Sequence, residues 1–283
     1  MTSLTLPAYA KINLALDIIG KRNDGYHLLR MIMQKVSLAD EITICRMPEG
    51  QGGITCSSAE LPLDEGNMAW RAFCCMKSRF QLADSAVIHV EKRIPIAAGL
   101  AGGSSNAATV IEAVAKLWQL PLTLAEKQEI GLSLGSDVPF CFLQDTALAE
   151  GVGEILTPLP KIPPFWVVLA NPGFPVETGE VFRQFSFDTK GTPPDLDLML
   201  DSLAKGNAVG ILQAMNNVLE SVTLTRFPVV AQLKEEMTAC GLTAMMSGSG
   251  PTVMGLTLDH KQAQAAVATL TKKWPWVFLA RTI

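Results

Sequence analysis

The chain has 283 residues, of which 48% are hydrophobic and 18% charged, and its formal net charge is −4. This length suits one large or two modest domains with a substantial core, and the slight negative charge excludes a general attraction to nucleic acid or anionic membranes. No apolar run approaches the roughly 20 residues of a membrane-spanning helix, and we find no secretion signal. The six scattered cysteines include no C-x-x-C pair, which argues against a zinc site or a disulfide framework, so we expect a cytoplasmic protein.

Alternating and β-branched residues predict strands in the first part of the chain. The predicted strands cover residues 4–19 as one or two strands, 36–46 with a bend at 38–40, and 87–94. A polar turn at 21–25 contains an Asp-Gly pair. Residues 67–80 are expected to form a helix with Asn67 as its N-cap.

The segment that begins at residue 104 has the clearest helical pattern. Its apolar residues fall on one face at helical spacing: Ala107, Val110, Ile111, Val114, Leu117 and Trp118. Ser104 or Ser105 can serve as the N-cap. A capping box of Thr123 and Glu126 then starts a second helix, which Gly135 ends, and a sharp polar corner is expected at 136–139.

Four prolines at 158–164 mark the expected boundary between two domains, 1–157 and 158–283. Two or three helices should fill residues 198–240, one of them starting at Pro228 and stopping before Gly241. The other elements expected in this part are strands at 165–170, 242–246, 252–256 and 277–280, a loop at 191–195 and a helix at 259–273.

Residues 95–106 read Pro-Ile-Ala-Ala-Gly-Leu-Ala-Gly-Gly-Ser-Ser-Asn and are the most informative segment. Glycines let the backbone approach a ligand, and the start of the following helix presents N–H groups that suit an anion. No Lys follows Gly103, which excludes a P-loop, and Ala101 stands where the dinucleotide pattern needs its second Gly. We interpret the segment as a phosphate-binding loop; the alternative is an ordinary strand-to-helix turn whose small residues serve packing.

A second glycine-rich element, Ser-Gly-Ser-Gly-Pro at 247–251, lies between two short apolar strands. Taken in isolation, it is most simply a hairpin turn. Together with the first loop, it is expected to close over phosphates or substrate, because its hydroxyl and N–H groups are suitable donors.

A few polar residues do not match their apolar surroundings. Lys11 and Asn13 are two residues apart and would share one face of a strand. Asp137 lies between a helix end and an apolar run, and His27 follows Tyr26 after a turn. Each has an ordinary alternative: a solvent-facing lysine, a turn or capping aspartate, and a surface or structural histidine.

Taken together, these motifs resemble those of the GHMP kinases, the superfamily of galactokinase, homoserine kinase, mevalonate kinase and phosphomevalonate kinase. The resemblance is strongest to the branch whose acceptor is a cytidine diphosphate derivative of methylerythritol. It is carried by six motifs in the expected order along nearly the whole chain, at residues 8–14, 24–27, 99–106, 135–139, 171–173 and 246–252.

The resemblance implies an α+β fold of two domains with the active site in the cleft. The N-terminal domain would be ribosomal-protein-S5-like and bind ATP, and the C-terminal domain would be ferredoxin-like and bind substrate. The implied reaction transfers the γ-phosphoryl group of ATP, with Mg²⁺, to the 2-hydroxyl of the cytidyl acceptor in the non-mevalonate route to isoprenoid precursors. We expect a small-molecule substrate, no nucleic-acid or membrane partner, and a monomer or weak homodimer.

The resemblance also implies residue roles. Asp137 would be the base that accepts the hydroxyl proton, and Lys11 its companion, whose charge keeps that carboxylate ionised. The implied nucleotide-binding residues are Asn67, Lys92, Pro95, Ala97, Ala98, Gly99, Leu100, Ala101, Gly102, Gly103, Ser104 and Ser105. The implied substrate-binding residues are Asn13, Tyr26, His27, Thr178, Phe182, Gly248 and Ser249. Tyr26 and Phe182 would stack on the cytosine, and His27 would hydrogen-bond to it; no side chain is assigned to Mg²⁺, which phosphates and water would hold.

The chain departs from the family pattern at Ala97 and Ala101, where many relatives have Gly; Ala costs little there if φ is negative. One alternative function is a GHMP-type kinase for another alcohol, such as homoserine, mevalonate or a sugar, which would share the loop but need no aromatic clamp. Another is a nucleotide sensor without catalysis, against which the presence of Asp137 and Lys11 argues.

Overall fold

The structure is a computed structural model in which residues 2–283 are described. Packing divides the chain into two compact units, each built from segments that are distant in sequence. Unit 1 comprises Met1–Ala10, Ala39–Ile94 and Ala101–Leu143, and unit 2 comprises Lys11–Leu38, Pro95–Leu100 and Gln144–Ile283. Both the long strands at the start of the chain and the glycine-rich loop therefore contribute to both units.

The strands of unit 1 follow the order β3-β4-β2-β1. They are β1 (Ser3–Lys21), β2 (His27–Met47), β3 (Gly53–Cys56) and β4 (Ser85–Glu91), of which β1 and β2 continue into unit 2. Strand β2 pairs antiparallel with β4, and β3 pairs parallel with β4. Ile42 and Ile44 of β2 are fully buried whereas Glu41 is exposed, so one face of this sheet is apolar.

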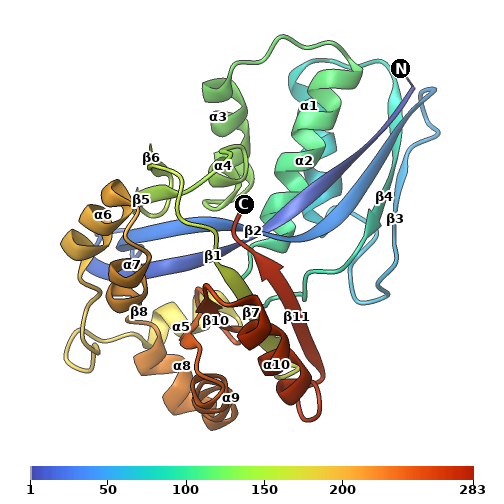
Figure 1. Cartoon of the computed structure of the whole chain (residues 1–283). Coiled ribbons are helices and arrows are strands. Elements are labelled where there is room, and N and C mark those ends of the chain that lie inside the picture. The colour runs from blue at the N-terminus through green and yellow to red at the C-terminus, as the bar shows by residue number, and fades with distance from the viewer. Residues whose placement is uncertain (1) are drawn as a thin grey trace. The chain divides into compact units, whose positions relative to one another are not determined.

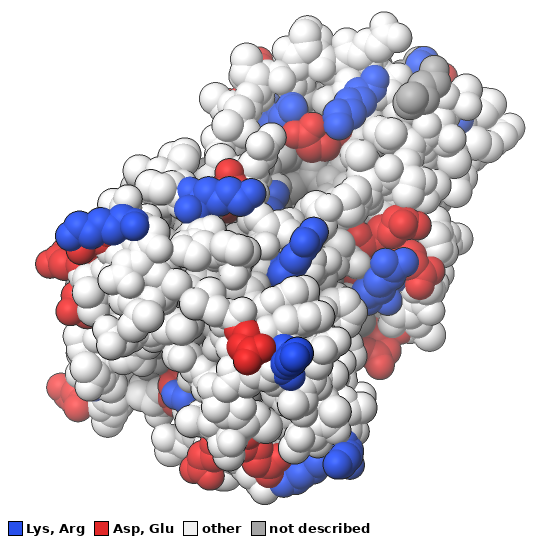
Figure 2. Space-filling view, viewed as in Figure 1, with Lys and Arg blue, Asp and Glu red and all other residues white. Residues whose placement is uncertain are grey.

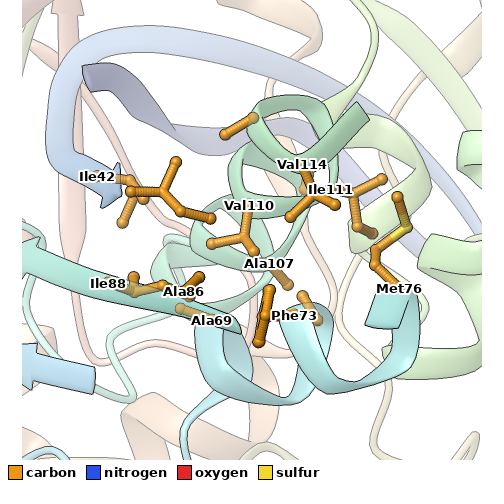
Figure 3. Packing of buried hydrophobic residues seen from close by; sticks show 14 of the residues in the cluster. Ile42, Ala69, Phe73, Met76, Ala86, Ile88, Ala107, Val110, Ile111 and Val114 are labelled. Atoms are coloured by element: carbon orange, nitrogen blue, oxygen red, sulfur yellow. The ribbon is translucent and has the colours of Figure 1, made fainter. Parts of the chain in front are cut away.

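Helices α1 (Met68–Arg79) and α2 (Gly102–Leu117) pack in one core with that apolar face of unit 1. Helices α3 (Leu124–Leu134) and α4 (Val138–Cys141) pack on α2 and on each other. Helices α1 and α2 lie side by side (Figure 1). Phe73 of α1, Val110 of α2 and Ile88 of β4 meet in the core between them and the sheet (Figure 3). The buried positions of α2 include the predicted apolar face, with Trp118 as its partly buried C-cap.

In unit 2, the continuing parts of β1 and β2 are flanked by further strands. Strand β8 (Asn216–Asn217) pairs with β1, whereas β5 (Ala147–Gly151) pairs with β2 and β6 (Ile155–Pro158). A separate antiparallel sheet has the order β11-β7-β10-β9. Its strands are β7 (Trp166–Asn171), β9 (Thr243–Met246), β10 (Val253–Thr257) and β11 (Trp276–Arg281).

Helices α9 (Pro228–Ala239) and α10 (His260–Leu270) pack on the antiparallel sheet of unit 2 and against each other. Its other helices are α5 (Thr178–Gln184), α6 (Leu196–Lys205), α7 (Ala208–Ala214) and α8 (Glu220–Arg226). Helix α8 contacts both α9 and α5 (Figure 1). It therefore joins the helix layer of the sheet to α5, which carries two of the predicted substrate residues, Thr178 and Phe182.

Several predictions from local signals are confirmed. Asn67 caps α1 by accepting the N–H of Ala69 at 3.0 Å, and the capping box of Thr123 and Glu126 starts α3. Gly135 ends α3, and Pro228 is the first residue of α9. These signals act within one turn of the chain, so the sequence alone suffices to predict them.

Two strand predictions are wrong, and the carboxylate of Asp40 explains the second of them. Strand β2 runs unbroken through 38–40 instead of bending there, and β4 ends at Glu91 instead of residue 94. Asp40 accepts the backbone N–H groups of Arg93 at 2.7 Å and Ile94 at 2.8 Å. These two N–H groups are thereby bonded to a side chain of β2 and not to a strand ladder, so the β4 ladder stops before Lys92.

Helix boundaries differ from prediction at several points. Helix α2 begins at Gly102 after Ala101, which makes no side-chain cap, so Ser104 and Ser105 lie in the first turn and neither is the N-cap. The predicted corner at 136–139 is a turn only at residues 136–137, and α4 begins directly after it at Val138, with Asp137 at the N-cap position. Residues 198–240 hold α6, α7, α8 and α9, more helices than predicted, because Gly206 and Asn207 end and restart a helix at adjacent residues. Helix α10 ends at Leu270, earlier than residue 273.

The surface carries both signs of charge. Lys and Arg are interspersed with Asp and Glu on the face drawn in Figure 2, in keeping with a net charge of −4. Within residues 2–283, no helix is long and apolar enough to cross a bilayer. All six cysteines of the sequence are free thiols.

Candidate active site

The predicted site residues fall into two groups, one in each unit, and the glycine-rich loop contributes to both. Its backbone is left-handed at alternate positions: φ is 48° at Ala97, 75° at Gly99 and 54° at Ala101. The two alanines therefore do not meet the condition of negative φ under which they would cost little. Left-handed backbone costs a non-glycine residue about 1–2 kcal/mol, so this loop stores strain at Ala97 and Ala101.

In unit 1, the start of α2 offers donors for an anion. The N–H of Ser105 bonds to the carbonyl of Ala101 at 2.9 Å, so the N–H groups of Gly102, Gly103 and Ser104 lie before the first such bond. These N–H groups and the helix dipole favour negative charge at this end. A Cβ on Gly102 would lie 3.1 Å from Ile94 and 3.2 Å from Nζ of Lys92, so the helix start packs closely on the segment after β4.

In unit 2, the other half of the loop is held by its carbonyl groups. The carbonyl oxygen of Ala97 accepts the N–H of Val176 at 3.3 Å, and that of Leu100 accepts the N–H of Lys11 at 3.1 Å. The carbonyl oxygen of Gly99 accepts the hydroxyl of Ser247 at 3.0 Å. Ala98 between them is buried at 3% exposure. With its carbonyl oxygens bonded to protein donors, this half of the loop is held in one conformation.

Lys11 and Asn13 lie on β1 and face the same side, as the period of two predicted. Both are buried, and Nζ of Lys11 donates to Oδ1 of Asn13 at 2.8 Å. Nδ2 of Asn13 lies 3.5 Å from the sulfur of Met31 on the neighbouring β2. A buried ammonium is costly unless it is bonded, so this lysine is not the ordinary solvent-facing one.

The second glycine-rich turn lies beside these residues in unit 2. A Cβ on Gly248 would be 3.1 Å from the carbonyl oxygen of Gly99 and 3.6 Å from Oδ1 of Asn13. Oγ of Ser249 hydrogen-bonds to Oγ1 of Thr178, the first residue of α5, at 2.9 Å. Unit 2 thus brings together predicted residues from four separate parts of the sequence.

An aromatic cluster lies at the start of β2. The rings of His27 and Phe182 are tilted by 32° with centroids 5.6 Å apart, and Phe185 packs edge-on against His27 at 5.9 Å. Burial, and secondarily the charge of Lys21, lowers the pKa of His27 below its usual 6.5. This shift favours the neutral ring of His27, in which one nitrogen donates and the other accepts. Tyr26, its neighbour in sequence, is 64% exposed.

In unit 1, Asp137 precedes α4 and does not use its side chain to cap that helix. Two residues earlier, a Cβ added at Gly135 would lie 3.7 Å from the methyl group of Met68. A Cβ added at Gly103 would lie 3.4 Å from Cγ of the same Met68. The starts of α1 and α2 and the turn before Asp137 therefore meet around one methionine.

Asn67 and Lys92, the other predicted nucleotide residues of unit 1, both have bonds within the protein. Nδ2 of Asn67 donates to the carbonyl of Pro62 at 3.0 Å, while its oxygen caps α1. The Lys92 side chain is 7% exposed and pairs with Asp40 at 2.9 Å. Burial lowers the pKa of Lys92, and the adjacent carboxylate opposes that shift. A direct role of either side chain in nucleotide binding stays a prediction.

Within residues 2–283, no three His, Cys, Asp or Glu side chains form a group suited to a metal ion. The described residues thus offer no ready-made set of three carboxylate, imidazole or thiol ligands for Mg²⁺.

Sequence reasoning missed several residues that hold this site. These residues are Asp40, which bonds to the segment after β4, Phe185, which packs on His27, and Asn217 and Thr223, which bond to the second glycine-rich turn. Only Phe185 had a sequence signal, its helical spacing of three from Phe182. The others act on residues far away in sequence.

Comparisons with known proteins show which family of proteins the chain belongs to. A family model described as "GHMP kinases N terminal domain" matches residues 67–145, and one described as "GHMP kinases C terminal" matches residues 199–275. The chain belongs to the GHMP kinase family and is an ATP-dependent phosphotransferase with an alcohol group as acceptor. Its two-domain α+β fold is that of the family.

Curated relatives are similar over their whole length. A 4-diphosphocytidyl-2-C-methyl-D-erythritol kinase from Geobacillus kaustophilus (strain HTA426) is 44% identical over 99% of this chain and 97% of its own. A protein of the same name from Clostridium botulinum (strain Alaska E43 / Type E3) is 41% identical over 99% of this chain and 100% of its own.

Solved structures agree in fold. A crystal structure of 4-(cytidine 5'-diphospho)-2C-methyl-D-erythritol kinase matches with a TM-score of 0.84 and 32% identity, covering 99% of each chain. Homoserine kinase from Cytophaga hutchinsonii matches with a TM-score of 0.74 over 100% of this chain and 95% of its own. At 14% identity, the latter shows the shared fold alone.

Proposed function

We propose that this kinase transfers the γ-phosphoryl group of ATP to the 2-hydroxyl of 4-diphosphocytidyl-2-C-methyl-D-erythritol, a step in the non-mevalonate synthesis of isoprenoid precursors. Relatives with 44% and 41% identity over nearly the whole chain carry the name of that activity. The small-molecule acceptor would bind in unit 2 and the nucleotide at the start of α2.

The observation that carries the choice of acceptor is the pairing of His27 with Phe182. A neutral histidine beside an aromatic face suits a flat heterocycle, to which it can offer one donor and one acceptor. Tyr26, exposed and next to His27 in sequence, would supply the second face of the clamp. Homoserine, mevalonate and galactose have no such ring, so this cluster would add nothing to their binding.

We propose that Asp137 and Lys11 are the catalytic residues of the phosphoryl transfer. Asp137 would accept the proton of the acceptor hydroxyl, and the Lys11 ammonium would favour negative charge on the reacting oxygen. Most of the catalysis of phosphoryl transfer comes from positioning and charge stabilisation, which the N–H groups at the start of α2 would supply to the phosphates. Mg²⁺ would neutralise phosphate charge and be held mainly by the phosphates and water.

Asn67, Lys92 and the loop from Pro95 to Ser105 are proposed to bind the nucleotide. Asn13, Thr178, Gly248 and Ser249 are proposed to bind the acceptor. We further propose that the protein is cytoplasmic, because six free thiols suit a reducing compartment. A monomer or weak homodimer stays a prediction.

The test is an ADP-release assay with Mg-ATP on the purified protein. Initial rates with the cytidyl-diphospho-methylerythritol acceptor are compared with those for homoserine, mevalonate and galactose. Turnover confined to the cytidyl acceptor is the expected result. Faster turnover on another alcohol would overturn the proposed acceptor, and ATP binding without turnover on any of the four would favour a nucleotide sensor.

A further inference from the structure

One buried amide holds the main chain of the second glycine-rich turn. Nδ2 of Asn217, at the end of β8, donates to the carbonyl oxygens of Met246 at 2.9 Å and Gly248 at 2.8 Å. Its Oδ1 accepts the N–H of Leu219 at 3.0 Å. The side chain is buried at 2% exposure, so both donors and the acceptor of this amide are used inside the protein.

Two side chains further along the same segment bond to this turn or to the strand residue directly before it. Oε1 of Glu220 accepts the N–H of Met246 at 2.8 Å. Oγ1 of Thr223, which is fully buried, donates to the carbonyl oxygen of Ser249 at 3.1 Å. The residues stand at intervals of three, which places Glu220 and Thr223 on one face of α8 and Asn217 at the approach to it.

The opposite side of the turn contacts the predicted ligand-binding residues. Oγ of Ser247 donates to the carbonyl of Gly99, and Oγ of Ser249 bonds to Thr178. Successive peptide planes fix C=O and N–H together, so side chains that hold the carbonyl oxygens of a turn also set where its N–H groups point. An anion is bound by such N–H and O–H donors.

Helix α8 also anchors α5. Nη2 of Arg226 pairs with Oε1 of Glu180 at 2.6 Å. Glu180 lies between Thr178 and Phe182 in sequence, so one short helix supports both the turn and the helix that carries two predicted acceptor residues.

We propose that Asn217, Glu220 and Thr223 are positioning residues for the acceptor: they set the conformation in which the turn at 247–250 presents its donors to the anionic part of the substrate. The proposal rests on the proposed function for the identity of that substrate. A fully satisfied buried polar network favours one backbone arrangement over its alternatives, which is the property a preformed anion site requires.

The test compares two identical substitutions on one helix. Thr223→Val removes the hydroxyl bonded to Ser249, whereas Thr225→Val, the control, removes a hydroxyl that bonds only to the carbonyl of Ser221 in its own helix. We expect Thr223→Val to raise KM for the acceptor about five- to tenfold, the scale of one lost hydrogen bond. The kcat and the KM for ATP should stay close to those of the wild type, and Thr223→Ser should restore the acceptor KM.

A second readout does not depend on activity. Hydrogen exchange of residues 245–251 is followed by mass spectrometry, because the N–H of Gly250 bonds within the turn to the carbonyl of Ser247 at 3.0 Å. Exchange should be faster in Thr223→Val and in Asn217→Asp, which exchanges the amide donor for an oxygen, and unchanged in Thr225→Val.

Unchanged exchange and unchanged acceptor KM in Thr223→Val would overturn the proposal. A uniform loss of kcat with both KM values preserved would also overturn it, since a merely structural role would act that way. If the wild-type protein prefers another alcohol, the proposed function fails, and the same comparison made with that alcohol still decides whether these residues position the turn.

Discussion

Gly99 and Ser247 approach so closely that a Cβ on Gly99 would lie 2.2 Å from the carbonyl oxygen of Ser247. The two residues are 148 positions apart and are also joined by the hydrogen bond from Oγ of Ser247 to the Gly99 carbonyl. This contact joins the glycine-rich loop to the second glycine-rich turn within unit 2, and it leaves no room for a side chain.

Gly99→Ala is therefore expected to reduce the free energy of unfolding by about 3 kcal/mol, from left-handed strain together with backbone overlap. Gly206→Ala is the matched control, because Gly206 also has a positive φ of 62° but no atom within 4 Å of an added Cβ. That control should lose only about 1–2 kcal/mol. Urea denaturation of both variants gives the comparison, and equal losses would show that the close contact is unimportant.

Asp137→Asn tests the proposed base. Loss of a general base should lower kcat by about 100-fold or more, while the KM for ATP stays close to the wild-type value. Asp201→Asn is the control, since that carboxylate is exposed and pairs with Lys205 on the same helix. Initial-rate kinetics on both variants decide the matter: a fully active Asp137→Asn enzyme would disprove the assignment.

Ala101→Gly should stabilise the protein slightly. Relief of left-handed strain is worth about 1–2 kcal/mol, against about 0.5–1 kcal/mol of added chain entropy in the unfolded state. Ala204→Gly, in the exposed part of α6, has no such relief and should lose about 0.5–1 kcal/mol. Opposite signs of the change in Tm are the expected result, and a destabilised Ala101→Gly would mean that the loop gains from its alanine.

Asp40→Asn should destabilise unit 1 strongly. It leaves the Lys92 ammonium, at 7% exposure, bonded to the carbonyl of Ile94 but without its carboxylate partner, and breaking a buried ion pair on one side costs about 3–5 kcal/mol. Replacing both residues, as Asp40→Asn with Lys92→Met, removes the unpaired charge and should recover part of the loss. Chemical denaturation of the single and double variants tests this; a double variant less stable than Asp40→Asn would contradict it.

Stability should fall as the pH drops below 6.5, in part because of His27. Burial and the charge of Lys21 lower its pKa in the folded state, so protonation favours the unfolded chain. The contribution of His27 is complete above the unfolded pKa of 6.5 and is lost as the pH falls from there toward the folded value. Denaturation at pH 5.5 and 7.5 should show a smaller decline in His27→Gln than in the wild type, and an equal decline in the two proteins would contradict this contribution.

The sequence by itself was sufficient for elements that depend on neighbouring residues. The cap at Asn67, the capping box at Thr123 and the start of α9 at Pro228 are set by bonds and φ restrictions within one turn of chain, so their signals are local. The shared face of Lys11 and Asn13 followed likewise from the period of a strand, whereas their hydrogen bond is a finding of the structure.

Only the tertiary structure decided what fixes the site. Asp40 ends β4 from another strand, Ser247 meets Gly99 across 148 residues, and Asn217 holds the turn through main-chain oxygens that carry no sequence signal. The positive φ of Ala101 could not be predicted either, because glycine and not alanine is the residue typical of left-handed backbone. Such contacts depend on which distant segments pack together, and packing is a property of the whole fold and not of any one segment.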